Sequence, residues 1–171
     1  MDFKPSLLAD IGATNARFAI TEDGLSYHNP KELKISEYNS MRDLCMGYLS
    51  SIKTTNIRRA FIGVAAPVIG DVITFVNCDL EFNQSELKSS LFPDGLKVVN
   101  DLALQAHAVN LLEEVELEAI GQNFSDAEGP KVLVMPGTGL GMAGIVNEEV
   151  VSTEAGHLNI PAKIKKESLD Q

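Results

Sequence analysis

Apolar runs separated by short polar turns fill the first half of the chain, and four of these runs predict β-strands. Residues 7–12 and 16–21 are two apolar runs joined by a short turn, so we expect a hairpin. Residues 31–36 predict a third strand. Residues 58–68 form an apolar run that ends in a loop with Pro and Gly, which is typical of a strand buried on both faces.

A helix is predicted over residues 40–53, where apolar positions recur with the spacing i, i+3, i+4, i+7. Ser40 precedes the first apolar residue and Asp43 follows three positions later, which is typical of a capped helix start. A second predicted helix begins at Asn83 or Ser85, because either side chain can cap a helix.

The remaining elements of this half give the chain an alternating order. They are a short extra strand over residues 71–77, a strand over residues 94–101 and a helix over residues 102–112. Apart from the extra strand, the order is β-β-β-α-β-α-β-α. A three-stranded meander followed by strand–helix units predicts an α/β fold with a mixed sheet and helices on its faces.

The pattern changes near Leu112. Residues 131–137 predict a strand, and residues 141–156 predict a hairpin with a polar turn, so a second, β-rich unit begins here. We therefore expect one domain over residues 1–112 and the beginning of another over residues 113–171.

Composition narrows the range of partners. The 171 residues suffice for one well-buried domain, or for one small domain and part of another. The formal net charge is −10 and the pI is about 4.7. This charge repels phosphate backbones and anionic lipids, so we expect neither a nucleic-acid partner nor a membrane surface.

Targeting signals and cysteines indicate the compartment. The sequence has no apolar run of transmembrane length, and its N-terminus lacks the basic region and apolar core of a signal peptide. Cys45 and Cys78 are far apart and make a poor disulfide framework, and Cys45 falls on the apolar face of the first predicted helix. These features predict a protein of the reducing cytoplasm.

The turn between the first two predicted strands is the first candidate site. Its sequence, DIGATN, has small residues that let the backbone approach a ligand and offer N–H groups to phosphate oxygens. Thr14 and Asn15 add side-chain donors, and Asp10 at the end of its strand suits Mg²⁺, bound directly or through water. The alternative is an ordinary hairpin turn, in which Asp10 and Thr14 satisfy backbone groups.

A second glycine-rich turn, PGTGLGMAG over residues 136–144, contains the formal pattern G-x-G-x-x-G. A dinucleotide fingerprint requires this pattern to open a helix, but the residues that follow it predict a strand. We therefore favour a second phosphate-binding hairpin, in which Thr138 supplies a hydroxyl group.

Two further groups of polar residues complete the candidate site. Asn100 and Asp101 end a predicted strand, and ligands of α/β sheets bind beyond the C-terminal ends of strands. Asp10 and Asp101 could have different roles, in which one carboxylate binds a metal ion and the other binds a substrate hydroxyl group. Asp101 could also be a simple helix N-cap. Glu154 and His157 lie in a glycine-containing loop that suits a sugar, or they are ordinary surface polar residues.

The ordered set of motifs resembles the bacterial-type glucokinase family, within the actin-like ATPase and hexokinase superfamily. The motifs are ADIGATNARFAI, APVIGDVITFVN, VVNDLALQA, PGTGLGMA and STEAGHLNI, and the resemblance covers residues 7–161. It implies a ribonuclease-H-like lobe with a mixed sheet, followed by the beginning of a second α+β lobe. It also implies ATP- and Mg²⁺-dependent phosphorylation of glucose, or a related hexose, at its 6-hydroxyl group.

The resemblance assigns roles residue by residue. The first phosphate loop matches Ala9, Asp10, Ile11, Gly12, Ala13 and Thr14, and the second matches Gly137, Thr138, Gly139 and Gly141. The sugar contacts match Asn100, Asp101, Glu154 and His157, with Asp101 as the general base.

Three departures from the family pattern matter. Leu80 stands where the family often has an aromatic residue. Ala13 stands where the family usually has a second glycine, so its methyl group could tighten the loop. Family chains are also much longer, so the resemblance implies that this chain is the N-terminal part of the enzyme. The resemblance also implies a homodimer when the chain is full length. We therefore expect the 171-residue chain alone to be inactive. The alternative is a non-catalytic sugar-sensing or scaffold protein with the same fold.

Overall fold

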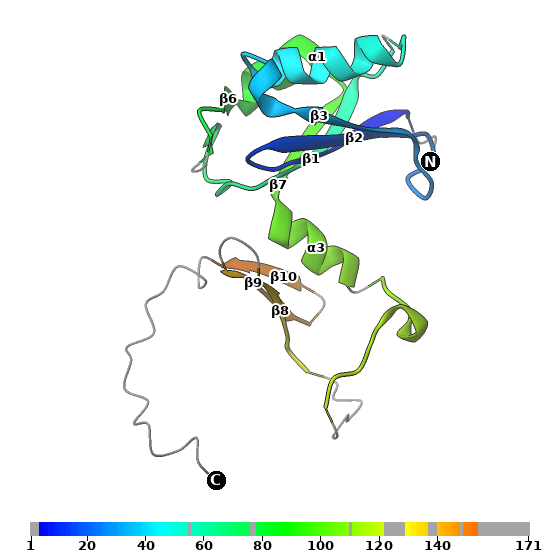
Figure 1. The fold of residues 1–171 in the computed structure, drawn as a ribbon, viewed down its shortest axis with the longest axis vertical. Coiled ribbons are helices and arrows are strands. Elements are labelled where there is room, and N and C mark those ends of the chain that lie inside the picture. Colours follow the sequence, from blue (N-terminus) through cyan, green and yellow to red (C-terminus); the bar gives the residue numbers. More distant parts are fainter. Residues whose placement is uncertain are drawn as a thin grey trace. The chain divides into compact units, whose positions relative to one another are not determined.

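The computed structural model of the chain describes residues 4–54, 56–75, 78–109, 111–121, 129–136, 140–147 and 149–153. The chain divides into two compact units, Met1–Leu111 and Leu112–Gln171, each of which is described by itself (Figure 1).

The first unit is built on a five-stranded mixed sheet in the order β3-β2-β1-β4-β7. Its strands are β1 (Ser6–Ile11), β2 (Asn15–Thr21), β3 (His28–Lys34), β4 (Arg59–Val64) and β7 (Gly95–Asn100). Strand β2 is antiparallel to β1 and β3, whereas β1, β4 and β7 run parallel. The structure thus confirms the predicted mixed sheet.

Helix α1 (Met41–Ser51) begins where the sequence predicts, because the Ser40 side chain accepts a hydrogen bond from the Asp43 backbone N–H at 3.0 Å. Its apolar face is buried, and Tyr48 stacks on Phe18 of β2 with ring centroids 5.0 Å apart. Cys45 lies on this face, and burial raises the pKa of its thiol to about 12, so it is a core residue.

Two more helices follow in the first unit. Helix α2 (Gln84–Leu91) is capped by Asn83, whose side chain accepts from the Glu86 N–H at 2.9 Å. The extra strand β5 (Val72–Thr74) pairs with β6 (Glu81–Asn83), a strand that the sequence pattern did not predict. Helix α3 (Asp101–Val109) follows β7 directly.

The third strand differs from its prediction over residues 31–36. It begins earlier, at His28, and ends at Lys34, where a 3₁₀ turn (Ile35–Glu37) follows. The Tyr38 N–H donates to the Ile35 carbonyl oxygen at 3.0 Å, which closes this turn and ends the strand.

The second unit contains a three-stranded antiparallel sheet in the order β10-β9-β8. Its strands are β8 (Lys131–Pro136), β9 (Leu140–Val146) and β10 (Glu149–Thr153), and a short 3₁₀ turn (Glu114–Glu116) precedes them. The β9–β10 hairpin confirms the prediction. No helix in the described part of the chain is long and apolar enough to cross a membrane.

Candidate active site

The turn between β1 and β2 is tight. The Gly12 N–H donates to the Asn15 carbonyl oxygen at 3.0 Å, and the strands pair again at once through Ile11 and Ala16. A Cβ atom added at Gly12 would lie 3.2 Å from the same oxygen. Glycine therefore lets the backbone turn this sharply, which leaves the turn small enough for close approach by a ligand.

Ala13 does not strain this turn. The non-glycine residues with positive φ in the described part of the chain are Asn29, Lys53 and Asn147, so Ala13 has a backbone conformation that any residue adopts. The backbone at this position therefore does not require glycine.

Asp10 is the penultimate residue of β1, next to this turn. It pairs with Arg17 of β2 on one side and with Gly63 of β4 on the other. Its neighbour Ile11 is fully buried, whereas the Asp10 side chain is 48% exposed and accepts a hydrogen bond from Arg17. The alternation along the strand thus puts the carboxylate on the more open face of the sheet.

Asn100 and Asp101 lie at the same edge of the sheet as the turn, because β1, β4 and β7 are parallel. Ile11 pairs with Val64, and Val64 pairs with Asn100, so the three residues form one row across the strands. Two strand spacings separate the Cα atoms of Ile11 and Asn100 by roughly 10 Å. The fold therefore brings the predicted loop and the predicted polar pair together.

Asn100, and not Asp101, caps helix α3. Its side-chain oxygen accepts from the N–H groups of Leu102 and Ala103 at 3.0 and 3.3 Å, as an N-cap residue does. Asp101 is the first residue of the helix, and its carboxylate accepts from the Leu102 N–H at 2.8 Å. Both side chains thus satisfy backbone N–H groups in the first turn of α3.

Asn100 also connects α3 to the end of β1. Its side-chain N–H donates to the Ala66 carbonyl oxygen at 3.2 Å, and the neighbouring Ala65 N–H donates to the Ile11 carbonyl oxygen at 2.9 Å. These two bonds join the strand of the candidate phosphate loop to the start of the helix that carries Asp101.

Gly63 supports this arrangement, and the sequence reasoning missed its role. A Cβ atom at this position would lie 2.9 Å from the Leu104 side chain and 4.0 Å from the Asp101 Cα atom. The missing side chain therefore lets α3 approach β4 closely. A glycine inside an otherwise apolar strand is the signal that could have identified this contact.

The second unit holds the other predicted residues. Gly141 lies in β9 opposite Met135, whereas Gly137, Thr138, Gly139, Glu154 and His157 lie outside the described residues. The segment after Gly141 continues as strand to Val146. The pattern G-x-G-x-x-G is therefore not a dinucleotide-binding motif in this chain, because such a motif has to open a helix.

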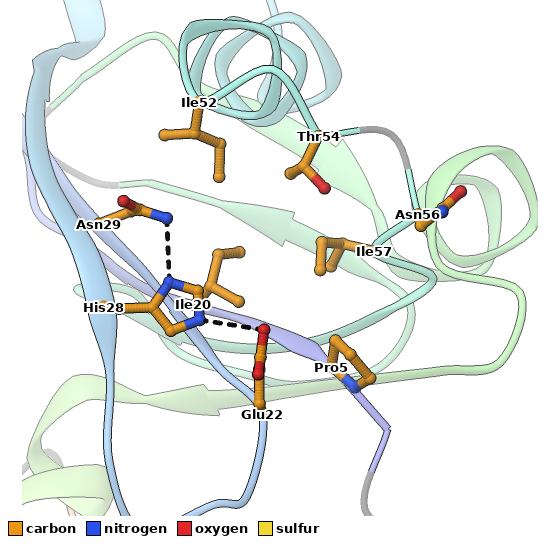
Figure 2. Close-up of a pocket in the computed structure, with 9 residues that line it drawn as sticks. All are labelled: Pro5, Ile20, Glu22, His28, Asn29, Ile52, Thr54, Asn56 and Ile57. Atoms are coloured by element: carbon orange, nitrogen blue, oxygen red, sulfur yellow. Dashed lines mark hydrogen bonds and ion pairs between the residues drawn. The ribbon is translucent and has the colours of Figure 1, made fainter.

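A pocket of about 170 Å³ in the first unit lies away from this site (Figure 2). Pro5, before β1, and Ile20, near the end of β2, line it, so it lies at the opposite edge of the sheet from Asp10. His28 lies between Glu22 and Asn29 at its rim, with its ring nitrogens 3.5 and 2.9 Å from their side chains. This pocket is not part of the candidate active site.

Known proteins share this fold. The chain is similar to a glucokinase from an Antarctic psychrotroph, whose crystal structure superimposes with a TM-score of 0.78 at 30% identity, over 94% of this chain and 53% of that one. A ROK family glucokinase from Streptomyces griseus, in complex with glucose and AMPPNP, superimposes with a TM-score of 0.59 at 19% identity, over 92% of this chain and 51% of that one. The mixed sheet and its helices are thus the α/β fold of glucokinases and ROK proteins.

Sequence comparison gives the family. The model of the Glucokinase family matches residues 7–169. A relative named Glucokinase from Ralstonia nicotianae is 36% identical over 163 residues, which are 90% of this chain and 48% of the relative. The chain therefore belongs to the glucokinase family, and it spans about half the length of the curated relatives it matches.

Proposed function

We propose that this chain, together with the further half that its relatives contain, phosphorylates glucose or a related hexose at the 6-hydroxyl group with ATP as donor. The observation that carries the proposal is the row Ile11–Val64–Asn100, which puts the β1–β2 turn and Asp101 at one edge of the sheet. A phosphoryl group held at the turn and a hydroxyl group held at Asp101 would then be neighbours, as in-line transfer requires.

Asp101 is the proposed general base. It would orient the 6-hydroxyl group and accept its proton as the phosphoryl group transfers. Asn100 is the proposed sugar ligand beside it. One of its two amide N–H groups donates to Ala66, and the other has no hydrogen-bond partner among the residues that the structure describes, so it could donate to a sugar hydroxyl.

The proposed first phosphate loop consists of Ala9, Asp10, Ile11, Gly12, Ala13 and Thr14. Within this loop Thr14 is exposed and Gly12 and Ala13 are half-buried, so a triphosphate could approach the turn, where the Thr14 hydroxyl would donate to a phosphate oxygen. Asp10 fits Mg²⁺, because this ion is commonly held by one or two carboxylates together with water and phosphate oxygens. Mg²⁺ bound with ATP would neutralise charge on the transferring phosphoryl group.

The second unit would supply the rest of the site. From the family resemblance we assign Gly137, Thr138, Gly139 and Gly141 to a second phosphate loop, and Glu154 and His157 to the sugar. We likewise propose domains over residues 1–112 and 113–171, the second beginning a larger α+β lobe, and a homodimer that works in the cytoplasm. The alternative is a non-catalytic sugar-sensing or scaffold protein with the same fold. Ala13 and the short chain motivate this alternative, and of these two the backbone bears on Ala13, whose φ is not positive, so this position does not require glycine.

An ATP-coupled assay of the full-length gene product over a panel of hexoses tests the proposal. We expect ADP release that depends on glucose and on Mg²⁺, and little or no turnover from the 171-residue chain alone. Absence of phosphorylation with every hexose would disprove it. Glucose binding by calorimetry without turnover would instead favour the non-catalytic protein.

A further inference from the structure

Arg17 lies between two carboxylates on the face of the sheet that carries Asp10. Asp10 pairs with Arg17 across β1 and β2, and Arg17 pairs with Glu32 across β2 and β3. The Arg17 Nη1 atom lies 3.4 Å from Asp10 Oδ2, and its Nε atom lies 3.1 Å from Glu32 Oε2. In-register neighbours share a face, so the three side chains form one row.

This row has one cation for two acids, and neither ion pair is locked. The side chains of Arg17, Asp10 and Glu32 are 69%, 48% and 51% exposed. Exposed pairs of this kind are weak, so the guanidinium can leave one carboxylate and stay with the other.

We propose that Arg17 is a positioning residue that holds the Asp10 carboxylate until Mg²⁺ and nucleotide arrive, and that Glu32 retains Arg17 afterwards. The inference rests on the proposed function, in which Asp10 serves Mg²⁺. A guanidinium and Mg²⁺ compete for the same carboxylate because both are cations. Glu32 lowers the free energy needed for Arg17 to leave Asp10, because Glu32 already accepts a hydrogen bond from the Arg17 Nε atom.

Two substitutions with opposite expected effects test the proposal. The quantity measured is the Mg²⁺-dependent gain, which is the Kd of AMPPNP in EDTA divided by its Kd in saturating Mg²⁺, both by calorimetry on the full-length gene product. Arg17→Gln removes the competitor of Mg²⁺, so the gain should rise roughly 1.5- to 5-fold. Glu32→Gln removes the second partner of Arg17, so the gain should fall by a similar factor.

Two matched controls remove the same charges elsewhere. Lys31→Gln removes a positive charge next to Glu32 on β3, where alternation directs the side chain to the other face of the sheet. Glu22→Gln removes a negative charge at the opposite edge of the sheet. Both should leave the gain unchanged.

The outcomes separate this inference from the proposed function. If the wild-type protein binds AMPPNP with an Mg²⁺-dependent gain, but both variants shift the gain in the same direction or not at all, the role of Arg17 is wrong while the proposed function stands. If the wild-type protein does not bind AMPPNP under either condition, the proposed function itself fails, and the inference with it.

Discussion

The two units of the chain differ in how completely the apolar side chains of their sheets are buried. In the first unit, Leu7, Ile11 and Val64 are fully buried within a core that helices α1 and α2 help to close. In the second unit, Ala143 and Ile145 are buried, but Val132 on the neighbouring strand is 64% exposed. The first sheet is therefore stabilised within its own unit, whereas the described strands of the second leave apolar surface open to water.

This difference bears on the site. The row Ile11–Val64–Asn100 and the cap of α3 belong to the first unit, so Asp101 can be held in place by that unit alone. A rigid scaffold of this kind is what a base that must meet a hydroxyl group at hydrogen-bond distance needs. The second unit would have to be stabilised by further contacts before it could contribute ligands.

Separating the units is the strongest test of this comparison. We expect the fragment of residues 1–111 to unfold in one cooperative transition, because its core is its own. The fragment of residues 112–171 should show no cooperative transition, because a small sheet needs a covered apolar face. Thermal and urea denaturation followed by circular dichroism measures both, and a cooperative second fragment would contradict the comparison.

Truncation of one apolar side chain in each unit tests the difference in burial between the two sheets. Leu44 is fully buried on α1, so Leu44→Ala should lower the free energy of unfolding by about 2–5 kcal/mol. Val132 is mostly exposed, so Val132→Ala should change it by less than about 0.5 kcal/mol. Urea denaturation of the 171-residue chain gives both values. Equal losses from the two variants would show that the second sheet is as well covered as the first.

Substitution of Asn100 should lower the free energy of unfolding of the first unit by a smaller amount. Asn100→Ala removes the cap of α3 and the bond to Ala66, and should cost about 0.5–2 kcal/mol of unfolding free energy. Asn100→Ser keeps a capping oxygen and should recover part of this loss. If the two variants were equally stable, capping would not be the structural role of Asn100.

Acid should weaken the β2–β3 hairpin of the first unit slightly. Hydrogen bonds from the Ser26 and Leu25 backbone N–H groups lower the pKa of Asp23 from its usual 3.8 to about 2. Because the folded state lowers this pKa, its stabilising contribution is complete above pH 3.8 and is lost as the pH falls through 2. The melting temperature of Asp23→Asn should therefore depend less on pH between 4 and 2 than that of the wild type, by calorimetry at matched salt. Identical pH profiles would contradict this assignment.

Local patterns in the sequence predicted most of the first unit. The apolar runs of β1, β2 and β4 and the Ser40 cap are signals carried by neighbouring residues, so they could be read directly. The start of β3 could not, since HNPKELK at the edge of the sheet is polar and almost wholly exposed. Strand β6 is only three residues long, which is too short to show alternation.

The site was predictable in its residue types and not in its contacts. The sequence placed Asp10 and Asn100 at the ends of strands, but the register that sets Arg17 beside Asp10 arises only when strands pair. Likewise, Asn100 and Asp101 are both good capping residues, and only the geometry of α3 decides that Asn100 is the cap.

Turnover of Asp101→Asn in the full-length gene product tests the central proposal most directly. The amide keeps the size of the side chain but cannot accept the proton, so glucose affinity should stay near wild type while kcat falls roughly 10²- to 10⁴-fold. Steady-state kinetics with glucose binding by calorimetry gives both numbers. Near-normal kcat in this variant would contradict the account, because the row of strands would then position a residue that the reaction does not use.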